Sequence, residues 1–351
     1  MLEIDEKLVA GLSSMGASFL ISILEIAQEQ YQIDPDELLD EIGLTKDKIE
    51  PVGARVPAYY LSMLFMSILK RSQDEHLALR IGQKTELKSF HILGYVLMNA
   101  RDIRECVERL IRYEKLLIES SMTTFEEADG ECSIQWHNPY QGPEGRHFSE
   151  IILTGWICIS RRMTNSTLTI NRVNYSHSPP SDISNFEKVY GCPVYFDQPF
   201  CSVEFSSPML DSPIQAADPV LSDIMKKHAD KMLLDYDTSI NFVSEVRGII
   251  FQLMPGGELS MDKVAEQIRL SNRVIHNRLK KHGVTFNDLV DEVRRILALF
   301  YIEDDSVSLV NIGLLLGFAD QSSFTRAFKR WQGETPGDYR KSSRKRQNDT
   351  T

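Results

Sequence analysis

The last third of the chain contains the same capped pair of helical segments twice, and this repeat constrains the fold more than any other feature of the sequence. Ser260 precedes a helical stretch from Met261 to Ile268, and Ser271 precedes a second stretch after a short turn. Ser308 and Asp320 occupy the same places in a later pair. Ser and Asp are favoured N-caps because their side-chain oxygens accept hydrogen bonds from the free amides of the first helical turn. The pattern therefore predicts two helix–turn–helix motifs.

A long helix is predicted between the two motifs, over Phe286–Ile302. At a rise of about 1.5 Å per residue it would span roughly 25 Å. It would hold the second helices of the two motifs about one DNA turn, ~34 Å, apart, and each of these helices has the form that enters a major groove. No strand pattern occurs after Ser239, so we expect an all-helical domain with helices over Ile240–Leu253, Met261–Ile268, Asn272–His282, Phe286–Ile302, Leu309–Leu316 and Gln321–Trp331.

The preceding part of the chain changes between helical and strand patterns, so residues 1–206 are predicted to form a mixed α+β domain. Roughly five strands are expected, over Ser120–Glu127, Cys132–His137, Leu168–Ser176, Pro193–Phe196 and Ser202–Phe205, the first two forming a hairpin around Ala128-Asp129-Gly130. The expected helices are Ser14–Gln30, Pro35 to Gly43, Pro57–Lys70, His76–Ile81, Gly94–Ala100, Asp102–Leu117, Arg146–Arg162, Asp182–Tyr190 and Val220–Leu234. A break at Asp235–Thr238 is the predicted domain boundary.

Charge is distributed unevenly along the chain. The 351 residues carry a formal charge of −11, which argues against a protein that coats nucleic acid uniformly. Residues 240–351 contain 17 Lys and Arg against 14 Asp and Glu, or +3, which leaves −14 for residues 1–239. From Gln321 onward there are 8 basic and 3 acidic residues. The basic end of the chain is therefore the predicted helical domain, as nucleic-acid binding by that domain requires.

The five cysteines, Cys106, Cys132, Cys158, Cys192 and Cys201, are dispersed and form no C-x-x-C pair, which indicates reduced thiols. The acidic N-terminus does not resemble a signal peptide, and the most apolar stretches are far shorter than the ~20 residues of a membrane helix. We therefore expect a cytoplasmic protein that does not associate with membranes.

The stretch Ile312–Trp331, IGLLLGFADQSSFTRAFKRW, is followed by Gly333, Thr335-Pro336 and Tyr339-Arg340. These residues closely resemble the C-terminal signature of the AraC/XylS family of transcription regulators, over residues 240–341. The segment Gly191–Phe205, with Asp211-Ser212-Pro213, Ala217-Asp218-Pro219 and Leu93-Gly94-Tyr95, resembles the "arabinose-binding" type of sensor domain in that family. Ornithine- and arginine-responsive regulators belong to this subgroup. The resemblance implies an effector-sensing or dimerisation domain over 1–235 and a double helix–turn–helix DNA-binding domain over 239–341.

The second motif separates into a core face and a reading face. Phe318, Phe324 and Phe328 have the spacing of core residues, and Gly317 permits the positive φ that the turn requires. The opposite face is predicted to contact DNA, since Gln suits adenine and Arg suits guanine or phosphate. Its residues are Gln321, Ser322, Thr325 and Arg326.

In the first motif, Val274, Ile275 and Leu279 are expected to face the core. Two residues depart from the family pattern. Arg269 occupies the position where the turn usually has Gly, and a left-handed backbone at this non-glycine residue would destabilise the turn by about 1 kcal/mol. Asn277 replaces a common Arg, which would shift the base preference away from guanine. The predicted reading face comprises Asn272, Arg273, His276, Asn277 and Lys280.

Further basic residues are predicted either to contact phosphates or to be simply solvated. They are Lys281, Lys329, Arg330, Arg340 and Lys341. Residues 342–351, with Arg344-Lys345-Arg346, are expected to be a disordered basic tail that adds at most weak electrostatic attraction.

The candidate effector-binding residues of the sensor domain are aromatic or polar groups at helix–sheet junctions, each of which is also consistent with an ordinary core or surface position. They are Tyr95, Tyr113, Trp136, His137, Arg146 and Trp156. His137 and His147 have no Cys or carboxylate at ligand spacing, so we expect neither a metal site nor a cofactor. The expected partners are promoter DNA, RNA polymerase, a small effector and a second copy of the chain in a homodimer. The helix Val220–Leu234 is a candidate for dimerisation and equally for a linker helix that packs on its own domain.

Two alternatives remain open from the sequence. The sensor domain could be an enzyme, but the chain has no phosphate loop, dinucleotide fingerprint, H-E-x-x-H or G-x-S-x-G motif, so we expect no catalysis. The protein could also be an effector-independent regulator, whose N-terminal domain serves only dimerisation or protein contacts.

Overall fold

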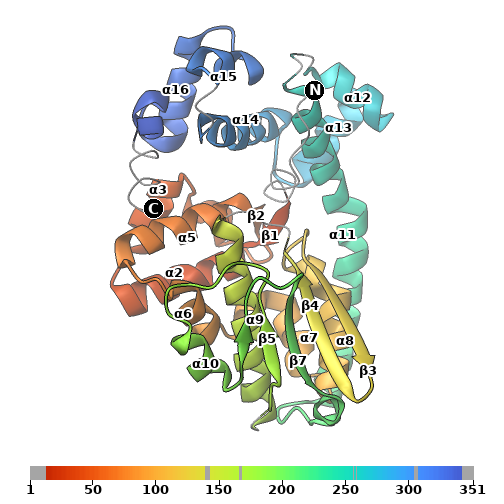
Figure 1. Ribbon diagram of the computed structural model, residues 1–351. Helices are drawn as coiled ribbons and strands as arrows, with labels where there is room; N and C mark the ends of the chain where they lie inside the picture. The colour runs from red at the N-terminus through yellow and green to blue at the C-terminus, as the bar shows by residue number, and fades with distance from the viewer. Residues whose placement is uncertain are drawn as a thin grey trace. The chain divides into compact units, whose positions relative to one another are not determined.

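The computed structural model describes residues 13–138, 143–165, 168–255, 257, 259–303 and 307–341. The chain divides into two compact units (Figure 1), here called the sensor unit and the helical unit. The sensor unit comprises Ser13–Leu39 and Leu44–Tyr236, and the helical unit contains the chain from Asp237 onward. The predicted tail 342–351 lies outside the described residues.

The sensor unit contains a five-stranded sheet, which confirms the predicted number and position of the strands. Its order is β3-β4-β7-β5-β6, and only the β5–β6 pair is parallel. The hairpin is also confirmed: Ala128 pairs with Glu131, and Asp129 and Gly130 have the positive φ of a tight turn, 52° and 82°. The strands are β3 (Met122–Ala128), β4 (Glu131–His137), β5 (Arg172–Asn174), β6 (Val194–Tyr195) and β7 (Cys201–Ser206).

Helices pack on the inner face of this sheet, where α8 lies against β3 and α9 against β7 (Figure 1). Alternate strand residues such as Cys132, Ile134 and Phe205 are buried there, as the period of a half-buried strand requires. The helices of the sensor unit are α2 (Ala17–Tyr31), α3 (Pro35–Ile42), α4 (Lys46–Ile49), α5 (Tyr59–Ser72), α6 (Leu77–Lys84), η1 (Leu87–Phe90), α7 (His91–Met98), α8 (Ile103–Tyr113), η2 (Glu114–Leu116), α9 (Pro143–Thr164), α10 (Ser184–Tyr190) and η3 (Ser207–Asp211).

The predicted start of the first helix, at Ser14, was wrong. Ser14–Gly16 forms a short strand, β1, which pairs antiparallel with β2 (Arg55–Pro57), and α2 begins only at Ala17. The partner strand lies about forty residues away in the sequence, so the apolar spacing of the helix gave no signal of this pairing. All five cysteines are free thiols, as predicted.

The predicted break at Asp235–Thr238 is wrong as a break in secondary structure. A single helix, α11, runs from Pro219 to Leu253 in place of two shorter ones. The division between the two compact units falls within this helix, between Tyr236 and Asp237. The sequence around Tyr236 contains no Pro or Gly, the residues that most often end a helix.

The remaining part of the helical unit follows the predicted order of helices. Ser260, Ser271, Ser308 and Asp320 each accept a hydrogen bond from the backbone amide three residues on, so the four predicted N-caps are confirmed. The helices are α12 (Met261–Ile268), α13 (Asn272–Lys281), α14 (Phe286–Glu303), α15 (Leu309–Leu315) and α16 (Gln321–Gln332).

Candidate functional site

The turn of the first helix–turn–helix motif contains a left-handed non-glycine residue. Arg269 ends α12 with φ 58° and ψ 39°, the conformation considered from the sequence. Leu270 donates its backbone N–H to Ala265 O at 3.0 Å, and Arg269 donates to Glu266 O at 3.2 Å. These two bonds form the usual C-terminal cap of a helix, in which Gly adopts the left-handed conformation without strain. Arg269 has a side chain, so the same conformation is strained in the first turn.

The turn of the second motif is unstrained and is stabilised by a residue that the sequence did not indicate. Gly317 has φ 72°, as predicted, and Phe318 donates its N–H to Gly313 O at 2.9 Å. Arg294, on α14, donates from Nε to Leu316 O at 2.9 Å, and its guanidinium lies 4.7 Å from the centre of the Phe318 ring. The guanidinium thus donates to a carbonyl at the C-terminal end of α15, where backbone carbonyls lack partners within the helix. It also joins the turn to the long helix α14.

The first reading face lies on α13. Ile275 and Leu279 are buried as expected, but Val274 is 37% exposed, so its assignment to the core was wrong. On this short helix, Ile275 and Leu279, four residues apart, supply the buried stripe and turn Val274 toward solvent. Asn272 donates from Nδ2 to Asp262 Oδ1 of α12 at 2.6 Å. The structure places all five predicted residues on the exposed side: Asn272, Arg273, His276, Asn277 and Lys280.

The second reading face lies on α16. Phe324 and Phe328 are fully buried and Phe318 is half-buried, so the helix packs on its predicted apolar side. Arg326 is exposed, and its Nη2 donates to Ser323 Oγ at 3.1 Å. Gln321 and Ser322 are exposed and Thr325 is half-buried, so the four predicted residues share one side of the helix.

The basic residues around these faces have different environments. Lys281, Lys329 and Lys341 are exposed, whereas Arg330 pairs with Asp291 of α14 at 2.7 Å. Arg340 is half-buried, so the expectation that it is simply solvated was wrong. Its Nε and Nη2 donate to the backbone oxygens of Ile302 and Val307 at 2.9 and 2.8 Å, so the guanidinium joins two segments of the helical unit instead.

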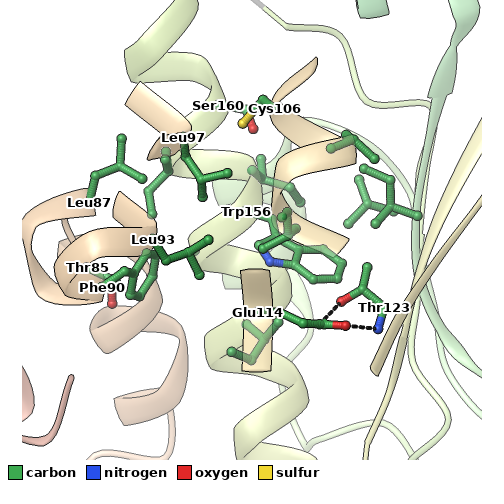
Figure 2. Close-up of a pocket in the computed structure, with 18 of the residues that line it drawn as sticks. Thr85, Leu87, Phe90, Leu93, Leu97, Cys106, Glu114, Thr123, Trp156 and Ser160 are labelled. Atoms are coloured by element: carbon green, nitrogen blue, oxygen red, sulfur yellow. Dashed lines mark hydrogen bonds between the residues drawn. The ribbon is translucent and has the colours of Figure 1, made fainter. Parts of the chain in front are cut away.

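The sensor unit contains a cavity of about 100 Å³ between the sheet and its covering helices (Figure 2). The walls are mainly Leu, Ile, Val and Phe side chains from α7, α8, α9 and the inner face of the sheet. Ser160 and Cys106 lie together at one side of the drawn residues, and Glu114 and Thr123 at another (Figure 2). Burial raises the pKa of the Cys106 thiol to about 12, as expected in apolar surroundings.

The charged group of the cavity wall is Glu114. The Thr123 backbone N–H donates to its Oε1 at 2.9 Å, and the Thr123 hydroxyl donates to Oε2 at 2.6 Å. Ser121 donates to the same Oε2 at 2.9 Å, and it accepts in turn from the indole nitrogen of Trp136 at 3.2 Å. This network fixes the carboxylate at the junction of η2 and β3, with two of its three bonds on one oxygen.

Residues 33–214 match the model of the arabinose-binding domain of AraC transcription regulators, N-terminal, and residues 264–342 match that of a helix-turn-helix domain. The chain belongs to the AraC family of transcription regulators. It is a DNA-binding member with a helix–turn–helix domain, as the sequence resemblance implied.

Relatives within this family match from about half to nine tenths of the chain. The ornithine utilization regulator of Pseudomonas aeruginosa is 24% identical over 320 residues, covering 91% of this chain and 94% of the relative. The transcriptional regulator VirS of Mycobacterium tuberculosis is 29% identical over 48% of each chain. Among solved structures, the regulator CdpR from Pseudomonas aeruginosa aligns with a TM-score of 0.46 at 17% identity, over 92% of this chain and 98% of that one.

The structure places one of the six effector candidates, Trp156, in the cavity wall of this AraC-family chain. Trp136 does not line the cavity, but its indole nitrogen donates to Ser121, which does. Tyr113 is buried elsewhere and donates to Asp230 Oδ1 at 2.7 Å, while Tyr95 and His137 are exposed. Thus the cavity does not bring the six together, because residue type alone does not indicate which side of an element faces a void.

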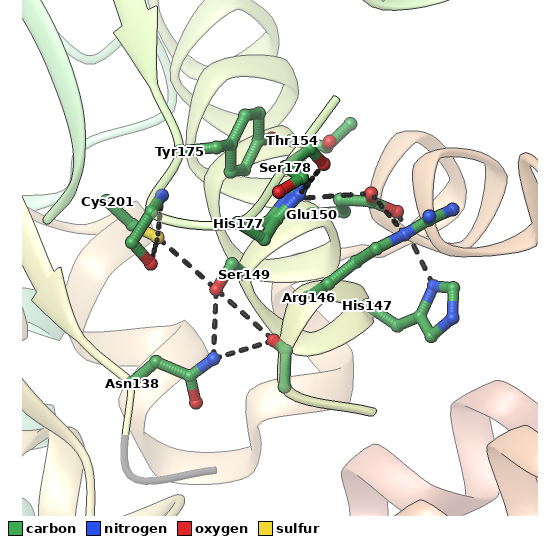
Figure 3. Close-up of polar contacts among 12 residues, drawn as sticks. Asn138, Arg146, His147, Ser149, Glu150, Thr154, Tyr175, His177, Ser178 and Cys201 are labelled. Carbon is green, nitrogen blue, oxygen red and sulfur yellow. Dashed lines mark hydrogen bonds and ion pairs between the residues drawn. The ribbon is translucent and has the colours of Figure 1, made fainter. Parts of the chain in front are cut away.

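The sixth candidate, Arg146, belongs to a separate buried cluster on α9 (Figure 3). Its Nε lies 3.2 Å from Oε1 of Glu150, whose side chain is only 1% exposed. His147 Nδ1 and His177 Nε2 lie 3.6 and 3.7 Å from the two carboxylate oxygens. Burial lowers the pKa of His177, and nearby Arg146 adds to this effect while Glu150 opposes it.

Within the described ranges, no group of three or more His, Cys, Asp or Glu side chains is arranged to hold a metal ion. Among those same residues, no helix combines the length and apolar character needed to cross a membrane.

Proposed function

We propose that α13 and α16 of this regulator read two successive major-groove segments of one DNA site. The observation that carries the proposal is that both helices follow a tight turn, bury one apolar side and expose a polar side rich in Asn, Gln, Arg and Lys. Helices of this kind contact base edges in helix–turn–helix complexes. The protein would act in the cytoplasm, by binding rather than by catalysis.

The two faces differ in the bases they favour. Arg326 and Gln321 on α16 suit guanine and adenine, whereas Asn277 on α13 suits adenine. We therefore expect the half-site read by α16 to contain guanine and the half-site read by α13 to be richer in adenine. A selection of DNA sequences on the purified protein would identify the site and test this difference.

Arg326→Ala tests base reading by α16. We expect affinity for the selected duplex to fall by roughly 1–3 kcal/mol, with relaxed specificity at one position. Lys329→Ala is the contrasting variant, because loss of a phosphate contact weakens binding to all duplexes alike. It also reduces, by about 1, the slope of the logarithm of affinity against the logarithm of salt concentration. Titrations at several salt concentrations separate the two. Unchanged affinity of the Arg326 variant for the selected site would contradict base reading by this helix.

The second part of the proposal is that a small molecule in the cavity modulates this DNA binding. The cavity supports it because it lies between the sheet and the helices α7, α8 and α9 and contains an ordered carboxylate in a mainly apolar wall. A ligand at about 100 times its dissociation constant should stabilise the fold by about 2.7 kcal/mol. Melting temperatures measured with amino acids, sugars, fatty acids and small aromatic compounds would detect it.

A second candidate function is an effector-independent regulator whose sensor unit serves only dimerisation. It is favoured by exposed apolar side chains on α11, where Val220, Ile224 and Leu234 are 70%, 53% and 67% exposed on one side of the helix. Light scattering on the wild type and on Ile224→Lys tests for a dimer. A dimer that Ile224→Lys disrupts, without stabilisation by any compound, would favour this candidate.

Both candidates require that the bound protein changes the activity of RNA polymerase. In vitro transcription from a promoter that contains the selected site, with and without the protein, would decide between activation and repression. An unchanged transcript level would contradict the regulatory role at that promoter.

A further inference from the structure

The size of the cavity limits its ligand. At about 100 Å³ it is of the same order as the cavity of ~150 Å³ that, in an engineered lysozyme, binds benzene. A ligand that fits without rearrangement has therefore about the bulk of one six-membered ring or a short alkyl chain. A long-chain fatty acid or a nucleotide exceeds this space.

The wall also limits the ligand's charge. Among the described residues that line it there is no Lys, Arg or His, so none of them supplies a cation to pair with a carboxylate or a phosphate. Within the same set Glu114 is the one acidic residue, and its carboxylate already accepts three hydrogen bonds. Burial of an unpaired charge is costly, so a zwitterion such as ornithine, which carries a carboxylate and two amines, would leave charges without partners.

The Glu114 carboxylate can accept a further hydrogen bond from a ligand. A carboxylate offers about four acceptor sites, and Glu114 Oε1 accepts only from the Thr123 backbone. One acceptor position thus remains on this oxygen for a donor of the ligand. Hydrogen bonds to charged groups are stronger than neutral ones, so one such bond would orient a small ligand in an apolar space.

We propose that this cavity binds a compact, uncharged, largely apolar effector whose single hydroxyl or N–H group donates to Glu114. The inference rests on the proposed effector function and names the chemical class of its ligand. It excludes free amino acids, including the ornithine of the relative's name, because their charged groups would be buried without partners, and it excludes sugars because most of their hydroxyl groups would be buried without hydrogen bonds.

Phenol and cyclohexanol are suitable probes, and benzene and cyclohexane are their counterparts without a donor. We expect the melting temperature of the full chain to rise with phenol or cyclohexanol, with affinities about 10- to 100-fold above those of the donorless pair. Ornithine and arabinose should give no shift. Stabilisation by ornithine or arabinose but not by phenol or cyclohexanol, or by none of the compounds, would overturn the proposal.

Two variants locate the binding. Gly155 lines the cavity, and a Cβ added there meets only Gly82 O, at 4.0 Å, so the backbone accepts a side chain at this position and we expect Gly155→Leu to fill part of the space. Gly248→Leu is the matched control, because it places the same side chain on helix α11 in open space. We expect the first variant to abolish phenol binding and the second to retain it.

Glu114→Gln tests the acceptor. It should reduce the preference for phenol over benzene toward unity, while benzene binding shows that the cavity remains formed. If this variant does not fold, Gly155→Leu still decides, since retained phenol binding in that variant would place the ligand elsewhere and refute the proposal.

DNA binding is measured separately on the same preparations. Specific DNA binding without phenol or cyclohexanol binding would refute the ligand class alone. Phenol binding without specific DNA binding would refute the proposed reading of DNA and leave the ligand class supported. Phenol binding that leaves DNA affinity unchanged would refute the effector role.

Discussion

Arg269 shows how one residue sets the quality of the first motif's turn. Its φ of 58° is a conformation that costs an L-residue roughly 1–2 kcal/mol and that Gly adopts freely. Gly also costs more entropy on folding, so we expect Arg269→Gly to raise the free energy of unfolding by a net ~1 kcal/mol or less. Urea denaturation measures it, and Arg273→Gly on α13 is the opposite control, since Gly inside a helix destabilises by about 1 kcal/mol. A loss of stability in Arg269→Gly would contradict the strained turn.

His177 is the residue at which pH should affect the sensor unit. Arg146, His147 and Glu150 of α9 face its ring, and Tyr175 and Phe196 pack against it. Its pKa is lowered in the folded state, so the unfolded chain binds this proton first as pH falls. Stability from neutral His177 is therefore complete above about pH 6.5 and is lost on acidification toward the lower folded value.

His177→Gln removes this titration. We expect the melting temperature of the wild type to fall more than that of the variant between pH 7.5 and 5.5. His137→Gln, at an exposed position, is the control and should behave as the wild type. Equal losses in the wild type and the His177 variant would contradict a protonation penalty at this position.

At the scale of elements, Arg294 connects the long helix α14 to the turn between α15 and α16. Its donors reach Leu316 O at 2.9 Å and Gly317 O at 3.3 Å. Arg294→Met keeps an apolar stem against Phe318 but removes both donors, and we expect a loss of about 2 kcal/mol in the free energy of unfolding. Arg330→Met is the matched control, because its exposed pair with Asp291 contributes under ~1 kcal/mol. Equal losses from the two variants, measured in urea, would show that the turn does not depend on Arg294.

At the scale of the whole molecule, α11 is shared by the two compact units, with residues 219–236 in one and 237–253 in the other. If this helix carries the effector's influence, Thr238→Pro should preserve phenol binding and DNA binding but abolish the effect of phenol on DNA affinity. Pro inside a helix breaks it at about 3 kcal/mol or more, whereas Thr238→Ala favours the helix and should keep the coupling. Allosteric coupling is typically 5- to 150-fold in affinity. If phenol still changed the DNA affinity of Thr238→Pro, the effect of the ligand would not depend on the continuity of α11.

Local features of both units were predictable from the sequence. The N-caps Ser260, Ser271, Ser308 and Asp320, the positive φ of Gly317 and the hairpin at Asp129-Gly130 all depend on residues within a few positions of one another. The family could also be recognised, because its signature is a contiguous stretch of such local features. The strands of the five-stranded sheet followed from β-rich stretches and the turn residues between them.

Features that depend on distant residues required the tertiary structure. The pairing of β1 with β2 and the bonds of Arg294 and Arg340 have no signal in nearby sequence. The cavity is the clearest case, since Glu114, Thr123 and Gly155 come from different elements and only packing decides which side chains face a common void. By itself, then, the sequence determined most helices, the strands of the five-stranded sheet, the caps and the family of this protein, because these depend on short-range backbone chemistry. Only the tertiary structure decided the chemical character of the cavity, because that depends on which side chains meet across the core.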